Sequence, residues 1–233
     1  MLIIKNLTKI FGDKKAVDNL SLTINPGEIY GFIGHNGAGK TTTLKSVVGI
    51  LEFDEGEIYI DGVSIKESPL ECKSKIAYIP DNPDLYDFMT GIEYLNFVSD
   101  VFGVGAERSE IIKKYADTFE LTDNLSAVIS SYSHGMKQKL AVISALVHNP
   151  KLIIMDEPFV GLDPKASHLL KEIMREICNG GGAIFFSTHV LEVAEKLCDK
   201  IAIIKDGKLI KTGTTEEVKG DMSLESVFLE LEG

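Results

Sequence analysis

The most informative segment of this chain is Gly34-His35-Asn36-Gly37-Ala38-Gly39-Lys40-Thr41. It matches the pattern G-x-x-x-x-G-K-[ST] in full, after an apolar stretch at 29–33 and before a helical pattern at 42–48. Glycines let the chain turn so that successive backbone N–H groups face one centre, and the following helix adds its positive N-terminal end. The pattern predicts a phosphate-binding loop between a strand and a helix.

Two side chains of this loop bring chemistry that a plain turn does not need. Lys40 would place a point charge on the β- and γ-phosphates of a nucleotide, and the Thr41 hydroxyl can ligate Mg²⁺. A purely structural strand-to-helix turn explains the glycines but not the adjacent lysine and threonine. We therefore expect a nucleoside triphosphatase site here.

A second acidic site is expected at Asp156 and Glu157, which follow the apolar run 152–155. Such a run is typical of a parallel strand covered on both faces, and ligands gather at the carboxyl ends of these strands. Asp156 is then placed to hold Mg²⁺, directly or through water. Because successive strand residues point to opposite faces, Glu157 should aim elsewhere, as a candidate general base for an attacking water. The alternative is an acidic strand end that only caps a helix.

Strand and helix patterns alternate around these two sites. Strands are expected at 2–7, 20–24, 29–33, 56–60, 75–79, 152–155, 183–186 and in a hairpin over 201–210, and helices at 42–48, 110–119, 164–177 and 191–197. The region from about 86 to 148 is largely helical, and Met136, Leu140, Ile143 and Val147 fall on one helix face. This order predicts an α/β core interrupted by a helical insertion.

The composition is that of an ordinary globular chain, with 233 residues, 44% hydrophobic and 25% charged. A formal net charge of −11 gives no basic footprint, so we expect no nucleic-acid partner. Three widely spaced cysteines argue against a disulfide framework. No apolar run approaches the roughly 18 residues that cross a bilayer, and the start lacks a signal-peptide pattern. We expect a cytoplasmic chain, so that any work at a membrane needs another chain to span it.

Together these residues resemble the nucleotide-binding subunits of ABC transporters over essentially the whole chain. The segment Tyr132-Ser133-His134-Gly135-Met136-Lys137-Gln138 lies where the family signature belongs, and it makes the resemblance specific. The resemblance implies ATP hydrolysis with ATP and Mg²⁺ bound. It also implies an α/β fold: a P-loop NTPase core, RecA-like with a mostly parallel sheet, an N-terminal antiparallel β subdomain and an inserted helical subdomain. A single domain, 1–233, would comprise a core (1–85 and 150–220), a helical signature subdomain (86–149) and a C-terminal helix (221–233).

The same resemblance assigns candidate site residues. Catalytic roles fall to Glu157 and to His189, the switch histidine, and metal contacts fall to Thr41, Asp81 and Asp156. ATP contacts are implied for Phe11 (stacking on adenine), Val17, Asn36, Gly37, Ala38, Gly39, Lys40, Thr41 and Thr42. Contacts with the ATP of a second subunit are implied for the signature residues Ser133, His134, Gly135 and Met136, and Asp163 belongs to the D-loop.

The chain departs from the family pattern at a few positions. Asp81 stands where the family usually has glutamine. An aspartate can still ligate Mg²⁺, but it cannot donate a hydrogen bond when ionised. With the altered signature and the tail 223–231, this substitution resembles the subgroup associated with drug, antibiotic or polysaccharide export. The remaining histidines, His148 and His168, are expected at the surface.

Partners follow from the signature and from the resemblance. Ser133 is a good N-cap for a helix beginning near Gly135, whose free N–H groups would face an anion. The resemblance implies a head-to-tail dimer, preferably of identical subunits, and a separate transmembrane permease on the inner face of the cell membrane. The segment 82–89 would border the groove that receives a permease helix, or else be a packed linker. The alternative function is that of a soluble ABC-type ATPase not coupled to transport.

Overall fold

The computed structural model describes residues 1–232, so Gly233, the last residue of the expected C-terminal helix, lies outside the described residues. An antiparallel sheet occupies the N-terminal part, with strand order β2-β1-β4-β5. Its strands are β1 (Leu2–Phe11), β2 (Lys14–Ile24), β4 (Glu55–Ile60) and β5 (Val63–Ser64). The strands expected at 2–7 and 20–24 are longer than predicted, because β1 and β2 continue into one hairpin with several register shifts. The turn of this hairpin follows Phe11, the last residue of β1, which lies near the phosphate loop.

A second, mostly parallel sheet has the strand order β10-β9-β3-β8-β7-β6. Its strands are β3 (Ile29–Ile33), β6 (Ile76–Ile79), β7 (Leu152–Asp156), β8 (Ala183–Thr188), β9 (Lys200–Lys205) and β10 (Lys208–Thr214). Only β10 runs antiparallel to its neighbour. Since β3, β7 and β8 are adjacent and parallel, their carboxyl ends meet at one edge. The phosphate loop, Asp156 and His189 are brought together there.

The parallel sheet separates two hydrophobic cores. Alternate residues of β7 show the division, because Ile153 and Met155 face one core while Leu152 and Ile154 face the other. The second core also contains the apolar side of the antiparallel sheet and of α1 (Lys40–Val47). The continuous apolar strands of the sequence are therefore covered on both faces, as predicted.

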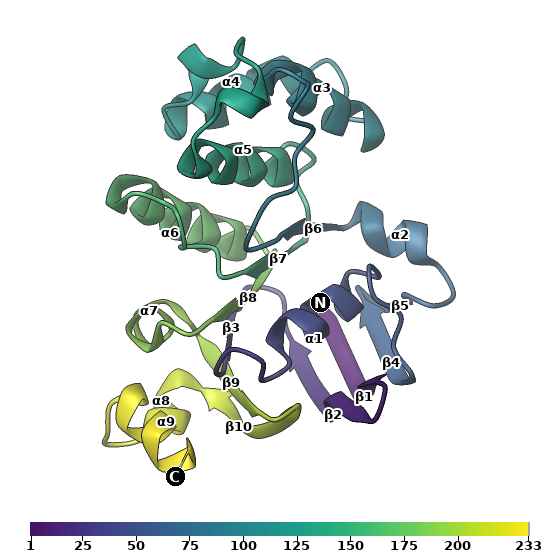
Figure 1. Cartoon of the computed structure of the whole chain (residues 1–233), viewed down its shortest axis with the longest axis vertical. Coiled ribbons are helices and arrows are strands. Elements are labelled where there is room, and N and C mark those ends of the chain that lie inside the picture. Colours follow the sequence, from purple (N-terminus) through teal and green to yellow (C-terminus); the bar gives the residue numbers. More distant parts are fainter. Residues whose placement is uncertain (233) are drawn as a thin grey trace.

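Helices fill the first core and both ends of the molecule (Figure 1). Besides α1 they are α2 (Pro69–Ser74), α3 (Gly91–Val101), α4 (Arg108–Thr118), α5 (His134–Leu146), α6 (Pro164–Asn179), α7 (Leu191–Leu197), α8 (Thr215–Lys219) and α9 (Leu224–Glu232), with short 3₁₀ turns at Thr122–Asn124 and Ile129–Ser131. The helices α3, α4 and α5 lie together between β6 and β7 in the chain, at the opposite end of the molecule from α8 and α9 (Figure 1). The predicted α/β architecture with a helical insertion is confirmed.

Two further findings concern membrane-spanning helices and the burial of His148. None of the helices within residues 1–232 combines the length and the apolar character needed to span a bilayer. His148 is not a plain surface residue, because it lies half-buried with its ring stacked on Phe102 at a centroid distance of 3.7 Å. Its Nε2 lies 3.1 Å from the carbonyl oxygen of Ile76. Burial lowers the pKa of His148 below its usual value.

Candidate active site

The phosphate loop connects β3 to α1 and depends on glycine at two points of close contact. A Cβ on Gly34 would lie 2.5 Å from the carbonyl oxygen of Ile204, and a Cβ on Gly39 would lie 2.4 Å from that of Ala16. Gly39 also has a φ of +108°, which side chains strongly disfavour. The loop is held from outside as well, since Gly207 N–H donates to the Ala38 carbonyl at 2.9 Å. Its shape is therefore fixed by the neighbouring strands.

A cavity of about 330 Å³ opens beside this loop. Its lining comprises Phe11, Lys14, Ala16, His35, Asn36, Gly37, Gly39, Lys40, Thr41, Thr42, Asp81, Asp156 and Glu157. Most of the predicted nucleotide and metal residues are thus gathered around one space. Lys14, Ala16 and His35 line the cavity but were not predicted as site residues.

Lys40 is nearly buried, with 6% of its surface exposed. Its ammonium donates to the carbonyl oxygens of Gly34 at 2.6 Å and His35 at 3.2 Å, and lies 3.7 Å from Glu157 Oε1. Burial lowers the pKa of Lys40, while the carboxylates of Glu157 and Asp156 oppose that shift. The lysine therefore satisfies its hydrogen bonds within its own loop, at the position where a phosphate would offer better acceptors.

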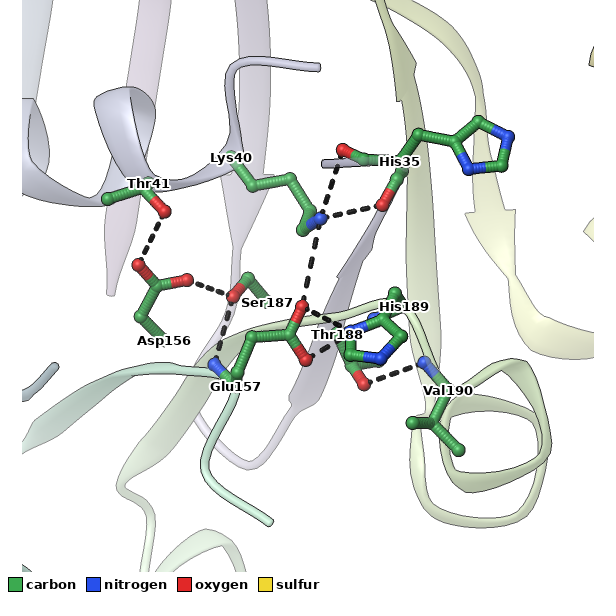
Figure 2. A network of polar contacts seen from close by, with 10 residues as sticks. His35, Lys40, Thr41, Asp156, Glu157, Ser187, Thr188, His189 and Val190 are labelled. Carbon is green, nitrogen blue, oxygen red and sulfur yellow. Dashed lines mark hydrogen bonds and ion pairs between the residues drawn. The ribbon is translucent and has the colours of Figure 1, made fainter. Parts of the chain in front are cut away.

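A hydrogen-bonded chain joins the loop to the ends of β7 and β8 (Figure 2). The Thr41 hydroxyl donates to Asp156 Oδ2 at 2.6 Å, and the Ser187 hydroxyl donates to Asp156 Oδ1. Asp156 is buried, with 1% of its surface exposed. A hydroxyl and a carboxylate at this distance are the oxygen donors that suit Mg²⁺. Asp81 lines the same cavity and accepts from the Asn82 N–H at 2.9 Å.

The oxygen donors named above would complete the shell of a hydrated ion rather than form a dedicated cage. Within the described part of the chain, no group of three or more His, Cys, Asp or Glu residues could hold a metal ion by itself. Mg²⁺ usually keeps several waters and binds through one or two carboxylates together with substrate phosphates. The donor set therefore fits Mg²⁺ that arrives with a nucleotide.

The Glu157 side chain is directed toward Lys40 and His189, whereas that of Asp156 is directed toward Thr41 (Figure 2). The expected strand alternation does not account for this difference, because Glu157 lies beyond the end of β7. Its backbone has a φ of +48°, and its N–H lies 3.2 Å from the Ser187 carbonyl and 3.1 Å from the Ser187 hydroxyl. Its Oε1 lies 2.9 Å from His189 Nδ1, and its Oε2 accepts from the His189 N–H at 3.4 Å. A non-glycine residue in this region costs energy, so the two hydrogen bonds to Ser187 are what hold it there. The result is a carboxylate fixed between a lysine and a histidine.

Phe11 and Val17, the two residues expected near the adenine, differ in their exposure to solvent. Phe11 is half exposed and lines the cavity, with Lys9 Nζ 5.2 Å from its ring centroid. Val17 is completely buried in the core beneath the antiparallel sheet and does not line the cavity, so its contact with ATP stays a prediction. Ala16 lines the cavity instead. The cause is a bulge in β2, where Lys9 pairs with Val17 and Ile10 with Lys15, leaving Ala16 as the extra residue.

The signature residues form a separate cluster that does not line the cavity. The Ser133 hydroxyl accepts from the Met136 N–H at 3.3 Å and caps α5, as predicted. A Cβ on Gly161 would lie 2.5 Å from His134 Cδ2, so the His134 ring lies directly on the D-loop. Asp163 caps α6 through the Ala166 N–H at 2.8 Å. Within one copy of the chain, these residues therefore lie apart from the cavity beside the phosphate loop.

Comparisons with known proteins agree with this geometry. Residues 17–160 match the ABC transporter family. The ABC-type transporter ATP-binding protein EcsA of Bacillus subtilis is 35% identical, with 99% of this chain and 96% of that protein covered. The linearmycin resistance ATP-binding protein LnrL of the same organism is 34% identical, over 94% of this chain and 70% of that protein.

Solved structures of similar proteins extend the comparison. An ATP-binding subunit of an ABC transporter superposes over the whole of both chains with a TM-score of 0.96 and 34% identity. The cassette MJ0796, solved as a dimer in a post-hydrolysis state with ADP and phosphate, has a TM-score of 0.84 at 26% identity, over 92% of this chain and 99% of that one. The chain therefore belongs to the ATP-hydrolysing, ATP-binding subunits of ABC transporters.

Proposed function

We propose that this chain binds ATP with Mg²⁺ at the phosphate loop, hydrolyses it between two copies of itself, and thereby powers export through a separate transmembrane permease. One observation carries the proposal: a continuous hydrogen-bonded chain runs from Thr41 through Asp156 and Ser187 to Glu157, beside Lys40 and in one cavity. A structural loop would need neither a buried ammonium nor a buried carboxyl group with a second, partly buried one beside it.

The binding step uses groups that are already in place. Lys40 Nζ leaves the carbonyl oxygens of Gly34 and His35 for the β- and γ-phosphates, which are stronger acceptors. Phe11 stacks on the adenine from its exposed position at the end of β1. Thr41 and Asp156, with Asp81 as a further donor, hold Mg²⁺, which neutralises charge on the phosphate oxygens.

In the hydrolytic step, Glu157 acts as general base. It takes a proton from water while the water oxygen forms a bond to the γ-phosphorus, and the bond to the β–γ bridging oxygen breaks with its electrons leaving on ADP. His189, with Nδ1 2.9 Å from Glu157 Oε1, holds the carboxylate in place. Base catalysis of this kind contributes about 10²–10⁴ in rate.

The signature residues supply the second half of the site from another copy. Ser133, His134, Gly135 and Met136 form the N-terminal end of α5, where free N–H groups and the helix dipole attract an anion. Their distance from the cavity of their own chain is accounted for if they face the γ-phosphate of a partner. Asp163 is joined to the middle of α5 by an ion pair with Lys139 at 2.8 Å. A retained Ser133 and a complete catalytic set favour two identical subunits.

The permease contact is proposed at the boundary of the helical insertion. Tyr86, Phe88 and Phe97 are exposed and their rings touch, with centroids 5.9 Å and 5.6 Å from that of Tyr86. Adjacent exposed aromatic side chains indicate a docking surface. Asp87 pairs with Lys137 of α5 at 2.6 Å, so this surface is bonded directly to the signature helix. In this arrangement the core is 1–85 and 150–220, and the helical subdomain is 86–149.

The proposed location follows from docking on a permease, and the proposed direction of transport follows from the similarity to a relative. A chain docked on a permease lies peripherally on the inner face of the cell membrane, where ATP is available. Export of a drug, antibiotic or polysaccharide is supported by the name of the relative LnrL, a resistance protein. The alternative remains a soluble ABC-type ATPase without a permease.

The catalytic part is tested with Glu157→Gln. This variant should bind ATP, form a stable dimer in its presence and hydrolyse it at least about 100-fold more slowly, because the amide cannot accept a proton from water. Glu172→Gln, an exposed change on α6, is the matched control. Undiminished turnover of Glu157→Gln would remove this residue from its role. Ser133→Ala in the Glu157→Gln background should prevent ATP-dependent dimerisation; an unchanged dimer would exclude the signature from the interface.

The partner is tested by purification from the native cell under mild detergent. A chain with several apolar spans should accompany the wild-type protein, and Phe88→Ser should release it without changing ATPase activity. Co-sedimentation with ribosomes, without any such chain, would favour the alternative function.

A further inference from the structure

We propose that Phe228 on the C-terminal helix α9 is a positioning residue for ATP binding, because its ring supports His35 and thereby the main chain of the phosphate loop. The ring centroids lie 4.9 Å apart at 66°, an edge-to-face contact. Phe228 is buried, with 7% of its surface exposed, whereas His35 is an exposed residue of the loop. The proposal rests on ATP binding at this loop; His35 lines the nucleotide cavity, whereas Phe228 lies outside its lining.

The main chain of His35 is bonded to other residues of the phosphate loop. Its carbonyl oxygen accepts from Lys40 Nζ at 3.2 Å and from the Ala38 N–H at 3.1 Å. Both partners belong to the part of the loop that would surround the phosphates. The pattern G-x-x-x-x-G-K-[ST] leaves this position free, so the motif itself does not require the His35 side chain. Its contact with Phe228 is therefore a feature of this chain, not of the motif.

The helix α9 is anchored independently of the loop. Its first residue, Leu224, donates its N–H to Glu195 Oε2 at 3.0 Å, and Lys205 Nζ donates to the Leu231 carbonyl at 3.1 Å. Glu195 belongs to α7, the helix that begins two residues after His189. Lys205 ends β9, next to the turn that holds the Ala38 carbonyl. Figure 1 shows α9 at the C-terminal end of the molecule, beside α8.

A fixed ring at Phe228 thus limits where His35 can move. The loop contains Gly37 and Gly39, both at positive φ, so its backbone has conformations available that other residues would exclude. A contact that selects the binding conformation increases apparent affinity, because less of the population must be reorganised on binding. It does not touch the reacting atoms, and so the chemical step should be little affected.

The test compares ATP affinity, KM and kcat among matched variants with Mg²⁺ and ATP as the probe. Phe228→Ala should raise the Kd and KM for ATP roughly two- to ten-fold, the range expected for an aromatic pair, with kcat within two-fold of wild type. The control is Leu224→Ala, which truncates a completely buried side chain one turn away on the same helix. This control should lower the melting temperature but leave the Kd for ATP unchanged.

Changes at His35 complete a double-mutant cycle. His35→Ala should weaken ATP binding as much as Phe228→Ala, the double variant should be no weaker, and His35→Phe should restore affinity by keeping a ring at this position. Equal changes in Kd for Phe228→Ala and Leu224→Ala, or multiplying effects of His35→Ala and Phe228→Ala, would overturn the proposal. If Phe228→Ala does not fold, the test uses His35→Ala alone, because His35 is exposed and its substitution should not prevent folding. Equal Kd values for ATP in wild type and His35→Ala would then refute the proposal. Wild-type protein without ATP binding would instead refute the site assignment.

Discussion

The carbonyl oxygen of Ala16 lies between two glycines, and this contact can be tested by adding one methyl group. A Cβ on Gly39 would lie 2.4 Å from that oxygen, and a Cβ on Gly207 would lie 2.9 Å from it. The oxygen belongs to backbone and cannot rotate away. Gly39→Ala therefore requires β2 or the phosphate loop to move. Gly37→Ala in the same loop is the matched control, because Gly37 also has a positive φ of +84° but no atom within 4 Å of its Cβ position.

The expected magnitudes follow from these two environments. Alanine at positive φ costs about 1–2 kcal/mol, and both variants should lose this much stability. Overpacking adds about 1–3 kcal/mol in Gly39→Ala alone. For a chain of this length, that difference corresponds to a melting temperature roughly 2–12 °C below that of Gly37→Ala. Thermal and urea unfolding of the nucleotide-free proteins would measure it. Equal losses of stability in Gly39→Ala and Gly37→Ala would show that the close contact between the Ala16 carbonyl oxygen and Gly39 does not hold the loop in place.

Three further outcomes are expected from other contacts. Burial lowers the pKa of His148 in the folded state, so the unfolded chain takes up the proton first and the free energy of unfolding should fall as the pH drops below about 6.5. Urea unfolding from pH 7 to 5 would measure this dependence, which His148→Gln should reduce. An identical pH dependence in wild type and variant would contradict the prediction. Asp163→Ala removes the cap on the Ala166 N–H and should cost about 1 kcal/mol, most of which Asp163→Asn should restore in the same assay. Thr41→Ala should weaken ATP binding when Mg²⁺ is present and leave it unchanged in EDTA, since its hydroxyl acts on the metal; equal weakening in both titrations would place it on the nucleotide instead.

Much of the fold is encoded locally and was predictable. The phosphate loop fixes a strand before it and a helix after it, and continuous apolar runs such as 152–155 require burial on both faces. The position of Asp156 beside Thr41 follows from the parallel order of the strands. These features depend on the periodicity of hydrophobic residues and on the spacing of motif residues, both of which can be read from the sequence.

The features that were missed depend on contacts between distant segments. The helices α2 and α8 are six and five residues long, too short to show a helical period. The bulge at Ala16 is set by the pairing of β1 with β2 and by the approach of the phosphate loop, neither of which is visible in β2 alone. Strand alternation counted back from the buried Leu20, Leu22 and Ile24 would place Ala16 inside and Val17 outside. The register shifts between β1 and β2 reverse this order, so that Val17 is buried and Ala16 lines the cavity.

The charges around the cavity also explain why nucleotide and metal are expected to bind together. Lys14 and Lys40 contribute two ammonium groups to the lining, whereas Asp81, Asp156 and Glu157 contribute three carboxylates. A polyanionic triphosphate alone would meet more negative than positive charge at close range, in a partly buried site where repulsion is poorly screened. A divalent cation held by Thr41 and Asp156 would reverse that balance. We therefore expect the excess of carboxylates to favour the complex of ATP with Mg²⁺ over free ATP.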